Sequence, residues 1–287
     1  MFITKKWQDY EIIDAGNGNK LERWKTYVLK RPDPQTIWNV ANEELWQNCH
    51  AVYDRSQSGG GAWNFIKKLP ERWQVTYGDW QFYVRPTGFK HTGLFPEQAA
   101  NWDFMVEQIQ KCPKGRQAKV LNLFGYTGGA SVALAKSGAH VTHVDAAKGM
   151  VQWAKENMQL NKVDEQNVRY IVEDAKRFVQ REIRRGNHYD GIVMDPPSYG
   201  RGPGGELWKL EDELQELVAL CAQLLSDDAC FFVLNGYTTG FSQSVLYNIV
   251  DRELVTKHGG TVDADELCLP ITAGGFLPCG TSARWTK

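Results

Sequence analysis

Apolar and polar positions follow two different patterns along this chain, and the pattern changes near residue 85. Before that point, short runs of alternating apolar residues are separated by turn signals such as Asn17-Gly18 and Gly78-Asp79. After it, short continuous apolar runs alternate with stretches of helical period. The first pattern is typical of hairpins, and the second of parallel strands joined by helices. The sequence therefore predicts a small β domain over residues 1–85 and an α/β domain over residues 86–287.

The strands expected in the β domain are short. They cover residues 12–13, 21–29, 73–77 and 80–84. We interpret the many tryptophans of this part as its core, with stacking on nucleic-acid bases as the alternative. Lys67, Lys68 and Arg72 either contact phosphates or belong to a solvated face. The domain is expected to recognise substrate or to be structural.

The α/β domain alternates strands and helices with short connections, which is typical of a doubly wound parallel sheet. Strands are expected at 120–124, 140–144, 168–172, 189–194 and 230–234, and the longer helices at 96–111, 150–162, 210–225 and 242–256. Residues 266–271 and 275–285 have the pattern of a hairpin. The predicted fold is a Rossmann-like α/β sheet that ends in an antiparallel hairpin.

The stretch 119–145 has the order strand, glycine turn, helix, strand and acid. Gly125, Gly128 and Gly129 permit a tight turn in which backbone can approach a ligand where a helix begins. Asp145 ends the second strand, about twenty residues after the first glycine, where an acid commonly binds ribose hydroxyls. The stretch predicts a nucleoside site, with an ordinary strand-to-helix turn as the alternative.

The composition of the turn favours one nucleoside over another. A dinucleotide turn has the pattern G-x-G-x-x-G, whereas here Tyr126 and Thr127 lie between the glycines and no charged group is available for phosphate. S-adenosylmethionine contains ribose and adenine but no phosphate. The turn therefore favours S-adenosylmethionine over a nicotinamide dinucleotide.

A second informative turn, Asp195-Pro196-Pro197-Ser198-Tyr199, follows the strand at 189–194. Two prolines cannot extend a strand, and they give a rigid turn at the edge where ligands bind in open α/β sheets. Asp195 can accept a hydrogen bond from an amino group, and Tyr199 offers a ring for a planar base. The loop 200–205 after it is expected to be a substrate-side lid carrying Arg201. A purely structural turn is the alternative.

Composition narrows the choice of partners and surroundings. The 287 residues contain 33 Lys and Arg against 34 Asp and Glu, so the broad positive surface of a general nucleic-acid binder is not expected. The chain has no long apolar run and no signal-peptide core at its start, so we expect a cytoplasmic protein without a membrane partner. Its six cysteines have no metal-binding spacing, so we expect reduced thiols and no metal.

The runs NLFGYTGG (122–129) and MDPPSYG (194–200), with Asp145 and residues 173–175, resemble the class I S-adenosylmethionine-dependent methyltransferases. The order of elements, including the terminal hairpin, is similar to their seven-stranded sheet. Within that class the chain resembles the bacterial 23S ribosomal RNA methyltransferases that carry a small amino-terminal β domain. The run HTGLFPEQ (91–98) is similar to their cofactor-covering segment. The resemblance is good from about residue 85 onward and looser before it.

The resemblance implies a set of site residues. Those expected around the cofactor are Phe95, Gln98, Phe124, Gly125, Tyr126, Thr127, Gly128, Gly129, Asp145, Ala146, Asp174, Ala175 and Asp195. The glycine turn would surround the methionine part, Asp145 the ribose and Asp174 the adenine, with Phe95 and Gln98 closing over the cofactor. Asp195, Pro196, Pro197 and Tyr199 are the expected catalytic residues, and S-adenosylhomocysteine is the expected product.

The expected acceptor is a base nitrogen of RNA, with ribosomal RNA implied by the resemblance. Methylation of cytosine carbon 5 requires a cysteine nucleophile after the fourth or fifth strand, where this chain has Pro197-Ser198 and Asn235-Gly236. A methyltransferase for a small molecule or a protein is the first alternative, and a nicotinamide-dependent Rossmann oxidoreductase the second. The sequence leaves open the modified atom and the oligomeric state, for which a homodimer is one option.

Overall fold

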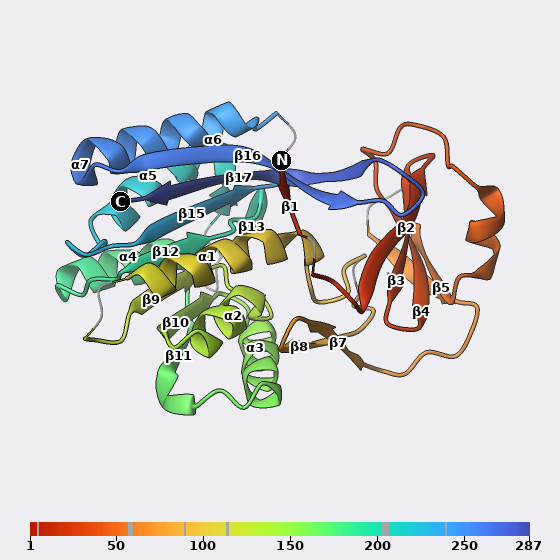
Figure 1. The fold of residues 1–287 in the computed structure, drawn as a ribbon, viewed down its shortest axis with the longest axis horizontal. Coiled ribbons are helices and arrows are strands. Elements are labelled where there is room, and N and C mark those ends of the chain that lie inside the picture. Colours follow the sequence, from red (N-terminus) through yellow and green to blue (C-terminus); the bar gives the residue numbers. More distant parts are fainter. Residues whose placement is uncertain (5, 57–59, 89, 113–114, 202–206, 239) are drawn as a thin grey trace. The chain divides into compact units, whose positions relative to one another are not determined.

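The computed structural model describes residues 1–4, 6–56, 60–88, 90–112, 115–201, 207–238 and 240–287. These residues form two compact units, coloured along the chain in Figure 1. One unit, here the sheet unit, contains residues 1–2, 100–267 and 280–287, and the other, the β unit, contains residues 3–99 and 268–279. Neither unit is a single continuous stretch of chain. The functional division into domains 1–85 and 86–287 stays a prediction.

The sheet unit is built on an eight-stranded sheet of order β1-β16-β17-β15-β12-β9-β10-β11. Its strands are β1 (Phe2–Ile3), β9 (Lys119–Leu123), β10 (His140–Asp145), β11 (Val168–Val172), β12 (Gly191–Met194), β15 (Phe231–Gly236), β16 (Thr261–Pro270) and β17 (Phe276–Thr286). The five strands from β15 to β11 are parallel, and β17 pairs antiparallel to β15. The predicted Rossmann-like sheet with a terminal hairpin is confirmed. The edge strand β1 was not predicted, because two residues are too few to show a period.

Helices flank this sheet on both sides in Figure 1. They are α1 (Ala99–Lys111), α2 (Gly129–Lys136), α3 (Lys148–Leu160), α4 (Ala175–Arg184), α5 (Leu210–Ala222), α6 (Gln243–Val250) and α7 (Thr256–His258), with short helices η3 (Glu165–Asn167) and η4 (Asp251–Val255). The short helix η2 (Pro96–Gln98) belongs to the β unit. Covered on both faces, β9 buries Val120, Leu121 and Leu123 completely. Such a strand requires a continuous apolar run, which is the signal that the sequence carried. Among the described residues, no helix is both long and apolar enough to cross a membrane.

The β unit contains a five-stranded sheet of order β2-β3-β4-β5-β6 and the hairpin β7-β8. Its strands are β2 (Tyr10–Gly16), β3 (Asn19–Trp24), β4 (Tyr27–Pro32), β5 (Ala51–Arg55), β6 (Gly61–Phe65), β7 (Trp73–Tyr77) and β8 (Trp80–Val84), and η1 (Glu43–Asn48) is its short helix. The strands predicted at 73–77 and 80–84 are confirmed. The single strand expected at 21–29 is wrong, because the chain turns at Lys25 with a left-handed φ of 61°. No glycine marks that turn.

The tip of the carboxyl-terminal hairpin belongs to the β unit. The N–H groups of Thr272 and Ala273 donate to the carbonyls of Ile12 (2.8 Å) and Ile13 (3.0 Å). The hydroxyl of Thr272 also donates to Glu11 at 3.0 Å. The β unit is therefore completed by a segment distant from it in sequence.

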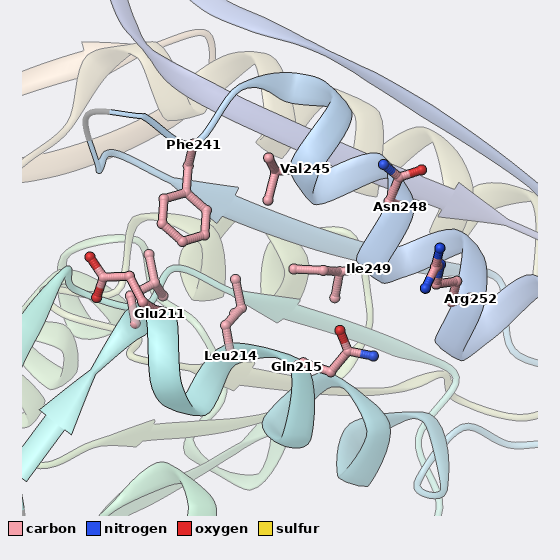
Figure 2. Close-up of a pocket in the computed structure, with 9 residues that line it drawn as sticks. Glu211, Leu214, Gln215, Phe241, Val245, Asn248, Ile249 and Arg252 are labelled. Atoms are coloured by element: carbon pink, nitrogen blue, oxygen red, sulfur yellow. The ribbon is translucent and has the colours of Figure 1, made fainter.

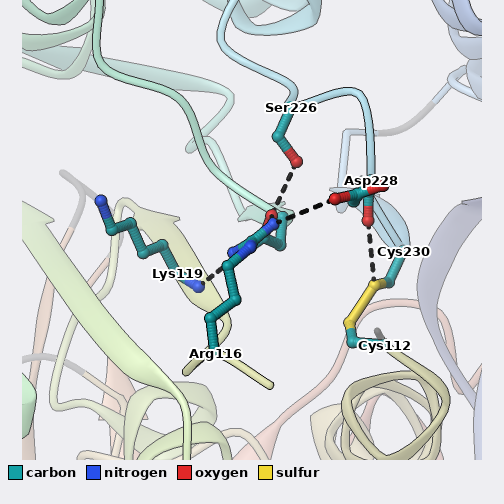
Figure 3. Close-up of a disulfide and its surroundings, with 7 residues drawn as sticks. Cys112, Arg116, Lys119, Ser226, Asp228 and Cys230 are labelled. Atoms are coloured by element: carbon teal, nitrogen blue, oxygen red, sulfur yellow. Dashed lines mark hydrogen bonds and ion pairs between the residues drawn. A yellow bond between two sulfur atoms is a disulfide. The ribbon is translucent and has the colours of Figure 1, made fainter. Parts of the chain in front are cut away.

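Cys112 and Cys230 form a disulfide, shown in Figure 3. The expectation of reduced thiols throughout is wrong for this pair, whereas Cys49, Cys221, Cys268 and Cys279 are free. Cys112 follows α1 and Cys230 precedes β15, and 118 positions separate them in sequence. Only the fold brings them together, so spacing could not reveal the pair.

Candidate functional site

The predicted site residues follow strands whose carboxyl ends lie at one edge of the sheet. Register aligns Leu123 at the end of β9 with Met194 of β12 on one side and Val144 of β10 on the other. The glycine turn, Asp145 and Asp195 therefore begin beside one another. This is the edge at which open α/β sheets bind ligands.

The glycine turn has a strained backbone. Phe124 (φ 56°) and Tyr126 (φ 49°) occupy the left-handed region, which side chains other than glycine rarely adopt. Gly128 follows with φ 86° and donates its N–H to the Gly125 carbonyl at 3.0 Å. Such strain persists only where surrounding structure fixes it, and it is concentrated at functional sites.

Each of the three glycines of the turn is packed against another part of the sheet unit. An added Cβ would lie 2.4 Å from the His143 ring at Gly125, 2.9 Å from Ala154 at Gly128 and 2.6 Å from the Trp102 ring at Gly129. The sequence suggested close approach of a ligand as the reason for these glycines. The structure gives another reason, because protein atoms fill the space that a Cβ would need.

Asp145 at the end of β10 is fixed against the turn by two backbone donors. The N–H of Tyr126 donates to its Oδ2 at 2.9 Å, and the N–H of Ala147 donates to its Oδ1 at 2.8 Å. Burial raises the pKa of Asp145, and the two N–H groups offset part of that rise. Each oxygen keeps a lone pair, so the carboxylate can accept two further hydrogen bonds from neighbouring hydroxyls.

A buried polar chain lies beneath the turn. Asn122 donates to the Ser131 hydroxyl at 2.8 Å, and that hydroxyl lies 2.9 Å from Nδ1 of His143. The Ser131 hydroxyl can accept from Asn122 and in addition either donate to Nδ1 or accept from it, so the tautomer of His143 sets the direction of this second bond. Burial lowers the pKa of His143 to about 4, so the ring is neutral at pH 7. This histidine was not predicted, since one polar residue within a buried strand forms no pattern.

The third acid of this edge follows β11. Asp174 caps α4 by accepting the N–H of Arg177 at 2.9 Å, and Ala175 after it is buried. Glu173 pairs with Arg181, and its N–H donates to the Asp145 carbonyl at 3.2 Å. The connection holds the Asp174 turn beside Asp145. Contact of Asp174 and Ala175 with adenine stays a prediction.

The Asp195-Pro196-Pro197 turn is held from two sides. The indole of Trp208 donates to the Pro197 carbonyl at 2.6 Å. The Ser198 hydroxyl lies 2.6 Å from that of Thr238, in the loop after β15. Trp208 also packs against Phe124, with 5.4 Å between the ring centroids, and so connects this turn to the glycine turn. Neither Trp208 nor Thr238 was predicted as a site residue.

Tyr199 begins β13 (Tyr199–Arg201), which pairs with β14 (Leu207–Lys209). The Tyr199 side chain is 57% exposed, so its ring is available to a planar partner. Of the lid expected at 200–205, Gly200 and Arg201 belong to β13, and residues 202–205 lie outside the described residues.

Phe95 and Gln98 belong to the β unit. Phe95 immediately precedes η2 and packs against the His91 ring at 5.1 Å, and Gln98 is buried in the last turn of η2. The indole of Trp7 donates to the Pro96 carbonyl at 2.9 Å and fixes this segment. Closure of Phe95 and Gln98 over the cofactor stays a prediction.

A groove of about 380 Å³ separates α5 from α6 and η4 (Figure 2). Leu214, Val245 and Ile249 line its middle, and Glu211 and Arg252 lie toward opposite ends. None of the predicted site residues lines it. The groove is therefore separate from the candidate site.

Known proteins resemble the chain over most of its length. Residues 36–245 match the family model described as S-adenosylmethionine-dependent methyltransferase. The crystal structure of a SAM-dependent methyltransferase from Agrobacterium tumefaciens is similar, with a TM-score of 0.93 and 38% identity, over 99% of this chain and 92% of that chain.

Two curated relatives have more specific names. Ribosomal RNA large subunit methyltransferase K/L of Syntrophotalea carbinolica is 30% identical over 64% of this chain but only 25% of its own length. Ribosomal RNA large subunit methyltransferase K of Neisseria meningitidis serogroup B is 25% identical over 84% of this chain and 68% of its own length. The chain thus spans a quarter of the first relative and about two thirds of the second.

Proposed function

The chain belongs to the S-adenosylmethionine-dependent methyltransferases, and we propose that it methylates a base nitrogen of RNA, with ribosomal RNA as the acceptor. The names of the two curated relatives support this acceptor. A ribosomal RNA acceptor would place the reaction in the cytoplasm. The family match leaves the oxidoreductase alternative without support.

The residues of the candidate site fit the cofactor. Asp145 is a preoriented carboxylate with spare lone pairs, as recognition of two ribose hydroxyls requires. The glycine turn places no charged side chain where a phosphate would need one. When bound, S-adenosylmethionine supplies an activated methyl group, so the protein has mainly to position the acceptor.

The observation that carries the acceptor proposal is the position of Asp195 beside the glycine turn and Asp145. A carboxylate there can accept a hydrogen bond from an amino group and orient the nitrogen lone pair toward the methyl group. The exposed Tyr199 ring, four residues later, can stack on the base that carries this amino group. The Ser198–Thr238 contact keeps the turn rigid.

The positions of the cysteines favour a base nitrogen over a ring carbon as the atom that accepts the methyl group. Among the described residues, Pro197-Ser198 follow β12 and Asn235-Gly236 are the last two residues of β15, and neither pair contains a thiol. Cys230 is held in the disulfide, and burial raises the pKa of Cys279 well above its usual range. A thiolate for covalent attack on a ring carbon is thus not provided at this edge.

A small-molecule or protein acceptor is the second candidate, and the near balance of 33 basic and 34 acidic residues favours it. Incubation with labelled S-adenosylmethionine and fractionated RNA, protein and metabolites distinguishes the two. We expect label in ribosomal RNA, on a base nitrogen after digestion to nucleosides. Label confined to protein or metabolites would contradict an RNA acceptor, and a covalent adduct with fluorinated cytosine in RNA would contradict the nitrogen.

A substitution of Asp195 tests whether this residue takes part in methyl transfer. Asp195→Ala should abolish or severely reduce transfer while leaving cofactor affinity nearly unchanged, because Asp195 orients the acceptor rather than the donor. Undiminished transfer by Asp195→Ala would contradict the proposed role.

A further inference from the structure

A buried polar cluster connects α1, β15 and β17 near the acceptor edge of the sheet unit. Asn101 and Ser282 are 0% exposed, and Asn235 is 1% exposed. Burying such groups costs free energy unless each is hydrogen-bonded. The proposed function does not use this cluster, and the cluster lies one strand away from Asp195.

The orientation of the Asn101 amide is fixed by its partners. Its Oδ1 accepts from Nε of Arg284 at 2.8 Å and from the Ser282 hydroxyl at 3.2 Å. A guanidinium can only donate, so the atom facing Arg284 must be the oxygen. The Asn101 NH₂ group therefore faces the other way, toward Asn235.

Arg284 is itself held in place. Its guanidinium stacks 3.6 Å from the Phe2 ring centroid and 4.8 Å from that of Phe104. Burial lowers the pKa of Arg284 to about 10, which leaves it charged at neutral pH. The hydrogen-bond chain thus starts from a guanidinium that can only donate, and this sets the direction of the chain.

The same chain orients Asn235. Asn101 donates to its Oδ1 at 2.9 Å. Asn101 lies on the β17 side of Asn235, because Ser282 and Arg284 both belong to β17. Since β15 lies between β17 and β12, the opposite edge of the planar amide, which carries Nδ2, faces β12.

The residue that Nδ2 faces follows from strand register. Met194, the last residue of β12, pairs with Leu234 of β15. The N–H of Asp195 still donates to the Leu123 carbonyl at 3.4 Å, so the chain keeps the direction of the ladder for one more residue and Asp195 lies next to Asn235. Neighbouring residues of parallel strands in register point to the same face of the sheet. The Asn235 amide and the Asp195 carboxylate therefore lie side by side on one face.

We propose that Asn235 is a positioning residue that donates through Nδ2 to the Asp195 carboxylate and fixes the direction in which Asp195 holds the methyl acceptor. Arg284, acting through Asn101, keeps Nδ2 turned toward Asp195. This inference rests on the proposed function of Asp195, and it adds a residue that sequence patterns did not indicate.

Two isosteric variants test the proposal. Asn235→Asp keeps the oxygen that accepts from Asn101 but removes the donor toward Asp195. Asn101→Asp keeps the oxygen that accepts from Arg284 and Ser282, but its loss of a donor lets the Asn235 amide reverse. For both variants we expect kcat to fall by about 10- to 100-fold, with little change in acceptor KM or in cofactor affinity by calorimetry.

Asn161→Asp is the matched control, because Asn161 is also a buried amide but caps the carboxyl end of α3. It should lower the melting temperature without lowering kcat. Wild-type kcat in Asn235→Asp would overturn the proposal, as would a loss of kcat in Asn161→Asp equal to that in Asn235→Asp.

A double-mutant cycle separates this inference from the proposed function. If Asn235 acts through Asp195, Asn235→Asp should cost little further rate in an Asp195→Ala background. A full additional loss there would overturn the inference alone. If Asp195→Ala by itself transfers at the wild-type rate, the proposed function of Asp195 fails, and the inference fails with it.

Discussion

Asp145 combines burial with two backbone donors, so its charge state determines what it can bind. Asp145→Ala removes a charge-assisted acceptor, and we expect it to weaken S-adenosylmethionine binding by about 1.5–3 kcal/mol for each strong bond lost. Because burial raises the pKa of Asp145, wild-type affinity should also decline with acid at a higher pH than for an exposed aspartate. Calorimetric titration at several pH values measures both effects.

Asp164→Ala is the control for this prediction. Asp164 also accepts a backbone N–H, that of Gln166 at 3.0 Å, but it precedes β11 rather than following a strand at the site edge. Cofactor affinity should be the same in Asp164→Ala and the wild type. Equal affinity in Asp145→Ala would refute the ribose assignment.

His143 makes the stability of the sheet unit depend on pH. Its pKa is about 4 in the folded chain and about 6.5 when unfolded, so only the unfolded chain gains a proton between these values. The contribution of His143 to the free energy of unfolding is therefore complete above pH about 6.5. It is lost as pH falls toward 4, by about 3 kcal/mol in total. His143→Gln should be less stable at pH 7.5 but should lose less stability on acidification to pH 5.

Thermal unfolding at the two pH values measures this difference. The same substitution at the partly exposed His140, on the same strand, should leave the acid-induced loss unchanged. If His143→Gln lost as much stability on acidification as the wild type does, a group other than His143 would be responsible for the pH dependence.

At the scale of single elements, α2 lies between two glycines that have similar backbones but different surroundings. Gly128 (φ 86°) precedes α2 and would place a Cβ 2.9 Å from Ala154, whereas Gly138 (φ 96°) follows it and would meet nothing within 4 Å. Gly138→Ala should cost only the left-handed backbone penalty of about 1–2 kcal/mol. Gly128→Ala adds an overlap of about 1–3 kcal/mol and should also weaken cofactor binding.

Urea unfolding and calorimetry compare these two variants. Equal destabilisation by both would mean that Ala154 moves aside at no cost. The comparison isolates the packing contribution, since the backbone requirement is shared.

The disulfide joins the end of α1 to the start of β15, at the edge of the sheet opposite the site. Closing a loop of 118 positions can stabilise the folded chain by as much as about 5 kcal/mol in the chain-entropy description, and less if the reduced unfolded chain retains structure. Reduction should lower the melting temperature and leave methyl transfer at moderate temperature unchanged. Cys112→Ser should be insensitive to reductant, and loss of transfer on reduction would contradict this separation.

Elements with a strong local signal were predictable from sequence. The strand at 168–172 and the hairpin around Gly78-Asp79 follow from apolar period and turn chemistry alone. The turn at Lys25 was not predictable, because the lysine there adopts a conformation that usually requires glycine. The edge position of Asp145 and Asp195 followed from parallel strand order. The hydrogen-bond chain from Arg284 through Asn101 to Asn235 could not be predicted in this way, since it joins residues that only the tertiary fold brings together.

At the scale of the whole molecule, the carboxyl-terminal hairpin serves both units. Ile271, in the tip, is buried and forms a bridge with Ile12, whereas Leu267, four positions earlier, is buried in the sheet unit. Ile271→Ala should destabilise by about 2–5 kcal/mol and reduce hydrogen-exchange protection most in β2 and β3. Leu267→Ala should reduce protection most in the sheet unit. The same protection pattern for both variants would show that the units unfold together.

The division of both units along the chain also has a consequence for inheritance. A gene exchange with one crossover near codon 99 would bring in residues 3–99 of a relative but keep the resident segment 268–279, which closes the β unit. The backbone of the imported strand β2 would then have to hydrogen-bond to Thr272 and Ala273 of the resident chain. An intact β unit can be transferred only with crossovers on both sides of the sheet unit's coding region. The β unit is therefore expected to be inherited together with the sheet unit, and not to be exchanged on its own.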